Sequence, residues 1–185
     1  MLDNQLFTIL IAAIESLEPQ AGIPNVASAA GVPVYQSYQP TQQGTPTGPC
    51  AFLNIIDHKR YGWVGRTDVW DAGQQKEIHT ETQQYMTTFQ MSALSTQDPS
   101  DTAQYTAGDI INLMSYIMNS SSMIEILRSN DIGVLRVDSA RNPYFVDDRG
   151  RFEASPSFDF IITHKQIVQN EIAVLQSTEF EIIPV

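Results

Sequence analysis

The sequence is poor in cysteine and in charge. Cys50 is the single cysteine among 185 residues, so the chain has no second thiol for an internal disulfide and lacks the paired-cysteine spacing of a zinc site. We interpret Cys50 as a small buried hydrophobe at the start of a strand. Charged residues make up only 17% of the chain. The surface should therefore be rich in Gln, Thr, Ser and Asn, which suits a protein whose faces meet other proteins.

Positive charge is missing from both ends of the chain. The first fifty residues and the last twenty contain no lysine or arginine, and the formal net charge is −11. Because no basic cluster is available to neutralise phosphates, tight binding to nucleic acid is not expected. An acidic surface can instead face DNA that has to slide past without sticking, since like charges repel.

Long hydrophobic runs are also absent. The apolar stretch "LFTILIAAI" follows Asp3, has no basic region before it and is far too short to cross a bilayer, so neither a signal peptide nor a membrane partner is expected. Its apolar residues recur at helical spacing. We predict a first helix with Asp3 as N-cap, ended by Pro19, with a buried stripe of Leu6, Leu10, Ala13, Ile14 and Leu17.

Recognisable catalytic motifs are missing. The chain contains no GxSxG, SxxK, P-loop or GxGxxG pattern. Its histidines, His58, His79 and His164, each lie alone in separate predicted strands, without HxH or HExxH spacing. We therefore expect no enzyme, no cofactor and no metal site.

One acidic stretch nevertheless needs a decision between two interpretations. "DDRGRFEASPSFDFIIT", residues 147–163, holds four carboxylates and two arginines. Its alternation predicts an amphipathic strand with Phe152, Phe158 and Phe160 on the apolar face. Glu153 and Asp159 share the polar face but lie about 20 Å apart at about 3.3 Å per residue, too far to share a metal ion.

We interpret that stretch as a charged hairpin arm whose tip is "DDRG". Pro156 would place the strand at a sheet edge or a bulge. Arg149 and Arg151 could neutralise the aspartates across the hairpin or pair with acids of a neighbouring subunit. The alternative is a metal-dependent hydrolase or nuclease that uses carboxylates of Asp138, Asp147, Asp148 or Glu153.

What the sequence does contain is an ordered series of helices and strands. After the first helix we predict strands at 34–38, 50–60 and 78–94, helices at 103–120 and 121–130, and a strand-rich end. Asp98 or Asp101 could cap the second helix. The fold class is α+β, a single domain over 1–185, with an antiparallel or mixed β-sheet and helices packed on one face. Extended loops are predicted at 39–49 and 62–77.

Two tryptophans, Trp63 and Trp70, fall in the predicted loop 62–77. They could cover the edge of the sheet. They could equally anchor a neighbouring chain, because Trp is enriched at the energetic centres of interfaces. With the hairpin charges, they complete our set of candidate interface residues: Trp63, Trp70, Arg149, Arg151, Glu153 and Asp159.

The order of elements resembles a known family of viral proteins. The segments that carry the likeness are "VPVYQSYQPTQQGTPTGPCAFLNI", "YMTTFQMSALSTQDPSDTAQYTAGDIINLM" and "LRSNDIGVLRVDSARNPYFVDDRGRFEASPSFDFIIT". Together they resemble the neck or tail terminators of long-tailed bacteriophages, which form the head–tail joining ring. The match spans roughly residues 30–165 and rests on the order of elements, with no catalytic residue to carry over.

The resemblance implies a structural virion protein with a tail-terminator-like fold. Such a protein would form a homohexameric ring that caps the tail tube and joins it to the head connector, while DNA passes through the lumen. Its partners would be tail tube and sheath proteins, neck and connector proteins, and genomic DNA in transient, non-specific contact. It would be assembled in the host cytoplasm and reside in the neck of the virion. The alternative within this class is another neck ring, a collar, stopper or head completion protein, of up to twelve subunits.

Overall fold

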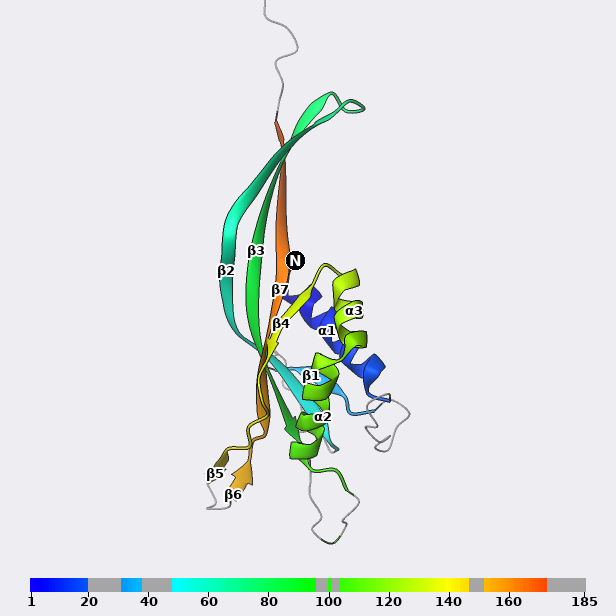
Figure 1. Cartoon of the computed structure of the whole chain (residues 1–185), viewed down its shortest axis with the longest axis vertical. Helices are drawn as coiled ribbons and strands as arrows, with labels where there is room; N and C mark the ends of the chain where they lie inside the picture. Colours follow the sequence, from blue (N-terminus) through cyan, green and yellow to red (C-terminus); the bar gives the residue numbers. More distant parts are fainter. Residues whose placement is uncertain (20–30, 38–47, 96–99, 101–103, 147–151, 173–185) are drawn as a thin grey trace, which may run out of the picture.

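The computed structural model describes residues 1–19, 31–37, 48–95, 100, 104–146 and 152–172. The elements within those ranges are three helices and seven strands (Figure 1). In chain order they are α1 (Asp3–Leu17), β1 (Val34–Gln36), β2 (Cys50–Asp71), β3 (Lys76–Leu94), α2 (Ala107–Asn119), α3 (Ser121–Ser129), β4 (Gly133–Val137), β5 (Tyr144–Val146), β6 (Phe152–Ala154) and β7 (Ser157–Ile172). None of these helices is long and apolar enough to cross a membrane.

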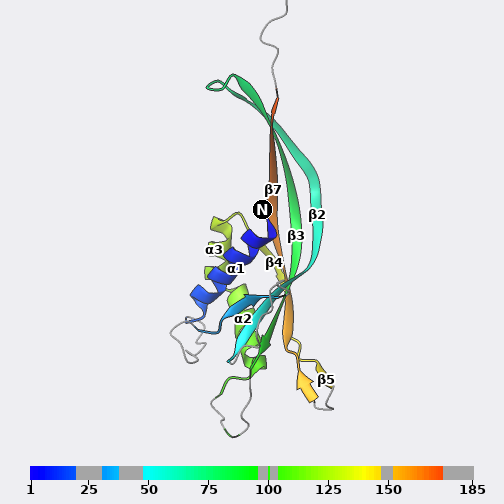
Figure 2. The same cartoon turned by 180° about the vertical axis from the view of Figure 1, so that it is seen from behind.

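The sheet confirms the predicted fold class. Five strands are hydrogen-bonded in the order β1-β2-β3-β7-β4, and β5 pairs with β6 in a separate two-stranded sheet. The β1–β2 pair is parallel and the other pairs are antiparallel, so the five-stranded sheet is mixed. The three helices lie together on one side of it, over its lower half (Figures 1 and 2). This is the α+β layer arrangement that the element order predicts.

The first helix begins differently from the prediction. Asp3 is the first helical residue, and Leu2 occupies the N-cap position. The Leu2 N–H donates to the side-chain Oε1 of Gln5 at 2.9 Å, so a glutamine reaching back satisfies this end of the helix. The other end matches the prediction, because α1 ends at Leu17 and Glu18 is its C-cap, directly before Pro19.

The second and third helices are capped by hydroxyl groups. Thr106, and not Asp98 or Asp101, is the N-cap of α2, and the two aspartates lie outside the described residues. The Asp109 N–H donates to Thr106 Oγ1 at 3.1 Å, and the Thr106 N–H donates to the Asp109 carboxylate at 3.0 Å. Ser120 caps α3 by accepting from the Met123 N–H at 3.2 Å. Ser120, whose backbone is extended, is also the C-cap of α2, so this one residue separates the two helices.

The prediction of a loop at 62–77 is wrong. Strand β2 continues to Asp71, the chain turns within four residues, and β3 begins at Lys76. The sequence hides this strand because a wide bulge between Tyr61 and Gly65 interrupts its alternation, with Gly62 at φ 70°. Of the predicted loop 39–49, residues 39–47 lie outside the described residues.

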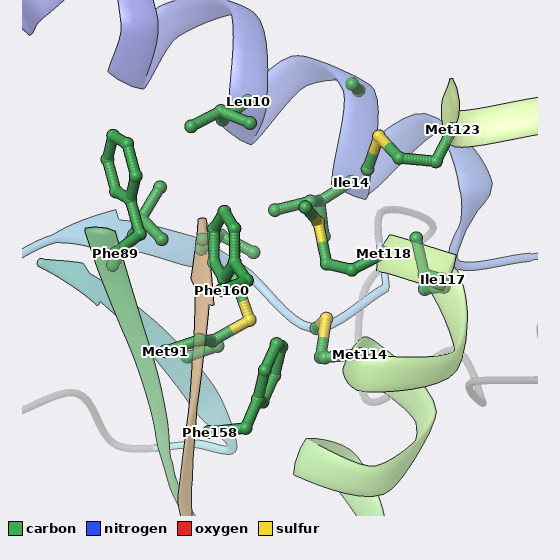
Figure 3. Close-up of a cluster of buried hydrophobic side chains, with 14 of the residues drawn as sticks. Leu10, Ile14, Phe89, Met91, Met114, Ile117, Met118, Met123, Phe158 and Phe160 are labelled. Carbon is green, nitrogen blue, oxygen red and sulfur yellow. The ribbon is translucent and has the colours of Figure 1, made fainter. Parts of the chain in front are cut away.

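The core lies between the three helices and the inner half of the sheet (Figure 3). Phe89 stacks on Phe160 with ring centroids 5.4 Å apart, and Phe160 contacts the ring of Phe158 at 5.8 Å. Leu10 and Ile14 of α1 and the methionines of α2 and α3 cover these rings. Each Å² of apolar surface removed from water contributes about 25 cal/mol to the free energy of unfolding, so this cluster is the main source of stability.

The acidic stretch is split between two sheets. Phe158, Phe160 and Ile162 are fully buried, which confirms the predicted apolar face. Ser155 and Pro156, however, separate β6 from β7, so residues 151–163 do not form one continuous strand. Pro156 stands between strands because its ring nitrogen has no hydrogen to give to a ladder. Residues 147–151, with the predicted hairpin tip, lie outside the described residues.

Candidate assembly surface

The outer halves of β2, β3 and β7 extend beyond the helices as a three-stranded arm (Figures 1 and 2). We define the arm as residues 57–86 and 164–172. Every residue of β2 from 57 to 70 and of β7 from 165 to 172 is exposed, whereas most of the central strand β3 is half-buried between them. The arm therefore carries no second layer within the described part of the chain. A sheet with neither face covered has no core of its own.

Both long edges of the arm have free backbone groups among the described residues. Strand β1 pairs with β2 only at Ala51, Phe52 and Leu53, well before the arm begins. On the other side, β4 pairs with β7 only from Phe160 to Thr163. From there outward, β3 is the only strand that pairs with either edge strand within the described residues, and at the base of the arm the Met1 ammonium also donates to the Lys165 carbonyl of β7 at 2.9 Å. Such an edge is a template for pairing with another chain.

Large apolar side chains are exposed along these same two edge strands. Trp63 is 97% exposed because it sits in the bulge of β2, which turns it away from the ladder, so it does not cover the sheet edge. Trp70, near the tip, is 53% exposed. The exposed apolar residues of the arm are Tyr61, Trp63, Val64, Val69, Trp70, Ile167, Val168 and Ile172, and none of them belongs to β3.

The arm is held together by polar contacts across its strands. Arg66 Nε donates to Glu81 Oε1 at 3.0 Å, joining β2 to β3, and Lys76 Nζ donates to Glu171 Oε2 at 2.6 Å, joining β3 to β7. His79 Nδ1 bonds to the Asp68 carboxylate, and this bond is the largest cause that raises the pKa of His79. These are exposed pairs, so each adds little to stability, but together they keep the three strands in register.

A chain of polar contacts crosses the sheet where the arm leaves the core, exposed at His58 and buried at Thr87 and His164. Thr87 Oγ1 lies 3.0 Å from His58 Nδ1 and 2.9 Å from His164 Nε2, so one hydroxyl of β3 joins β2 to β7. Thr87 is fully buried and His164 is 6% exposed. Burial, followed by the charge of the N-terminal ammonium, lowers the pKa of His164. The sequence places these histidines in separate strands, and only the strand register brings two of them to one hydroxyl.

A second buried polar group fixes β1 against α1. Glu18 Oε2 accepts from the Val32 N–H at 2.8 Å, and Glu15 Oε1 accepts from the Val34 N–H at 3.2 Å. Burial raises the pKa of Glu18 to about 7, and its Oε1 has no hydrogen-bond partner. A Cβ on Gly31, which has φ 75°, would lie 1.9 Å from Glu18 Oε2. Only glycine fits beside the carboxylate at this turn.

Among the charged candidates from the sequence, Asp159 is the one whose side chain the structure describes. Asp159 of β7 accepts from Arg141 Nη2 at 2.6 Å and from Gln90 Nε2 at 3.1 Å, so its partners come from its own chain. Arg149 and Arg151 lie outside the described residues, and for Glu153 only its backbone position in β6 is described. Sequence reasoning missed Arg141, because no spacing signal links it to a residue eighteen positions away.

The structure does not test the metal-dependent alternative, because Asp147, Asp148 and the side chain of Glu153 lie outside the described residues. No group of three or more His, Cys, Asp or Glu side chains there is placed to hold a metal ion. The nearest approach is His79 with Asp68 and Glu81, and in it Glu81 also pairs with Arg66. A cation already present at this position competes with any metal for the carboxylate.

Comparison with known proteins identifies the family. No curated protein sequence matches the chain. One protein family does, the family described as E217 gateway protein gp29, and the match covers residues 5–174. That range includes all seven strands, α2, α3 and all of α1 except its first two residues. The chain therefore belongs to the E217 gateway protein family, a family of structural proteins of the phage head–tail neck.

Proposed function

We propose that this chain forms the terminator ring of a phage neck, a closed homohexamer that caps the tail tube and joins it to the head connector. DNA would pass through the lumen of the ring. The observation that carries the proposal is the arm. This chain, a member of a family of neck proteins, has a three-stranded sheet with both faces and both edges exposed in the single chain. Its candidate interface residues are Trp63 and Trp70, both on the arm.

The arm has surfaces that no other described part of the chain covers. A three-stranded sheet becomes stable when one face packs on another layer, and this arm has none of its own. Eight large apolar side chains are exposed on its two edge strands, which is unfavourable in water unless another surface covers them. An assembly of several copies, or of copies with tube and connector proteins, would supply that surface.

The distribution of charge supports a lumen that lets DNA pass. Residues 57–86 and 164–172 hold five Lys or Arg and six Asp or Glu, so the arm has a net charge of −1 out of −11 for the whole chain. The remaining −10 lies on the rest of the subunit. Repeated around a ring, this charge would repel the phosphate backbone and keep DNA from adhering to the wall.

Electron microscopy of the purified chain, with its mass measured by light scattering after size exclusion, tests the proposal. We expect closed rings with sixfold symmetry that bind to the ends of purified tail tubes. Twelvefold rings that bind connectors and leave tube ends free would favour a collar or stopper instead. A chain that stays monomeric, even with tube and connector proteins added, would refute the ring.

A further inference from the structure

We propose that neighbouring copies of this chain join through their arms, with β7 of one copy pairing in parallel with β2 of the next. The arms would then form one continuous sheet around the assembly. The inference rests on the proposed ring, but it adds the surface, the two strands and their relative direction. The partner it commits to is a second copy of this chain.

The direction of the strands makes such a joint geometrically simple. Strand β3 is antiparallel to both β2 and β7, so the two edge strands run in the same direction on opposite sides of the arm. A rotation about an axis parallel to the arm would place β7 of one copy beside β2 of the next, pointing the same way. Each joint uses one edge of each kind, and closure leaves no edge unpaired.

The edge of β7 lacks the features that usually protect an exposed strand. Its ladder with β3 runs from Ser157 to Ile172 with no bulge and no proline. Natural edges are commonly blunted by bulges, prolines, charges or short length. Beyond His164, this edge carries only Lys165 and Glu171 as charged residues. A long, regular and mostly uncharged edge is what a strand partner requires.

The exposed apolar side chains lie where the proposed joint would cover them. Through β3, the register places Ile172 level with Trp70, and Ile167 level with Gly65 in the bulge of β2. Ile172 and Trp70 thus expose apolar groups at the same height near the tip, whereas Ile167 and Val168 lie level with Gly65 and Arg66, directly after the bulge that exposes Trp63 and Val64. The apolar residues of β3 in the arm, Ile78, Tyr85 and Met86, are already half-buried between its two neighbours. A further strand on each side would give the edge strands the same cover.

Charge favours a second copy as the occupant. Two subunits with a net charge of −11 each repel one another, but the arm itself carries only −1. Contact through the arm therefore brings together parts of the two molecules whose positive and negative charges nearly cancel. The other possible occupants, an antiparallel β7–β7 pair or a strand from a different protein, give different results in the experiment below.

Cysteine cross-linking distinguishes these arrangements. Thr67 of β2 and Gln169 of β7 are exposed, lie at the same height and both pair with Thr80, whereas the native Cys50 is fully buried. With a short bifunctional maleimide, the double variant T67C/Q169C should give a ladder from dimer to the complete ring. Either single variant should stay monomeric on a denaturing gel, because a head-to-tail joint never places two identical positions together.

The remaining outcomes each overturn a defined part of the proposal. Dimers from Q169C alone would show an isologous β7–β7 contact and would refute the parallel joint. An uncross-linked double variant that still forms rings in micrographs would refute the strand pairing and leave the proposed ring standing. No cross-links and no rings, under conditions in which tube and connector proteins are present, would refute both.

A matched pair of charge substitutions gives an independent test. Ile167 on the arm is 57% exposed and Leu135 of β4, outside the arm, is 58% exposed. We expect Ile167→Lys to raise the protein concentration needed for assembly at least tenfold, and Leu135→Lys to leave it unchanged. Circular dichroism of both variants checks that the subunit stays folded. Equal effects of the two substitutions on assembly would contradict the joint.

Discussion

Replacing Thr87 with valine tests whether the polar contacts that join His58, Thr87 and His164 connect the arm to the core. Valine keeps the shape of threonine, so the change removes one hydroxyl without opening a cavity. His164 Nε2 would then lose its bond of 2.9 Å, and its Nδ1 already has no partner. A buried imidazole without any hydrogen bond costs about 1–3 kcal/mol of the free energy of unfolding. For a chain of this size, each kcal/mol lowers the Tm by about 2–4 °C.

Urea unfolding followed by circular dichroism measures this cost. Thr88→Val is the matched control, because Thr88 is the next residue of β3, points to the opposite face and is half-buried. We expect a lower urea midpoint for Thr87→Val at an unchanged slope, and a change of less than about 0.5 kcal/mol for Thr88→Val. Equal midpoints for the two variants would refute the structural role of the chain from His58 to His164.

Three further predictions concern polar contacts elsewhere in the subunit. Gly31→Ala should cost more than about 2 kcal/mol in urea unfolding, because its φ is 75° and its Cβ would strike Glu18, whereas Gly48→Ala, with open space around it, should cost under about 1 kcal/mol. Glu18 has a folded pKa of about 7, raised from 4.5, so the folded state binds more protons between these values and the wild type loses stability as pH rises through that window. Glu18→Gln should remove this dependence of the free energy of unfolding on pH. The stability of the variant relative to the wild type should therefore improve by about 2–3 kcal/mol from pH 5 to pH 8. If the free energies of the two proteins fell in parallel with pH, the raised pKa of Glu18 would be contradicted. Arg141→Ala breaks a half-exposed pair with Asp159, and its cost should be about 0.5–1 kcal/mol in low salt and smaller at 1 M salt.

The sequence predicts the elements that bury one face. The stripe from Leu6 to Leu17 predicts α1, and the alternation of Phe158, Phe160 and Ile162 predicts β7, because burial on one side imposes a period on the sequence. Helix starts are harder to locate, since any Asp, Thr or Ser can cap. Asp98 and Asp101 precede Thr106 in the sequence, and local chemistry does not show which of the three residues is the N-cap.

The arm escapes prediction for the same physical reason. Its outer strands are exposed on both faces in the single chain, so no periodic burial marks residues 62–77 as a strand. Gly62 and Gly65 further favour a loop interpretation, although the bulge explains both. Contacts such as Arg141 with Asp159 depend on the pairing of distant strands, which the pattern within one strand does not contain.

A reconstruction of the neck in particles of the phage that encodes this chain would show both the ring and the joint between its subunits. We expect a closed ring of six copies between the connector and the tail tube, with density for DNA in its lumen and with the arms of adjacent copies paired along β7 and β2. A neck in which this chain is absent, or in which its arms touch no neighbouring copy, would contradict this expectation.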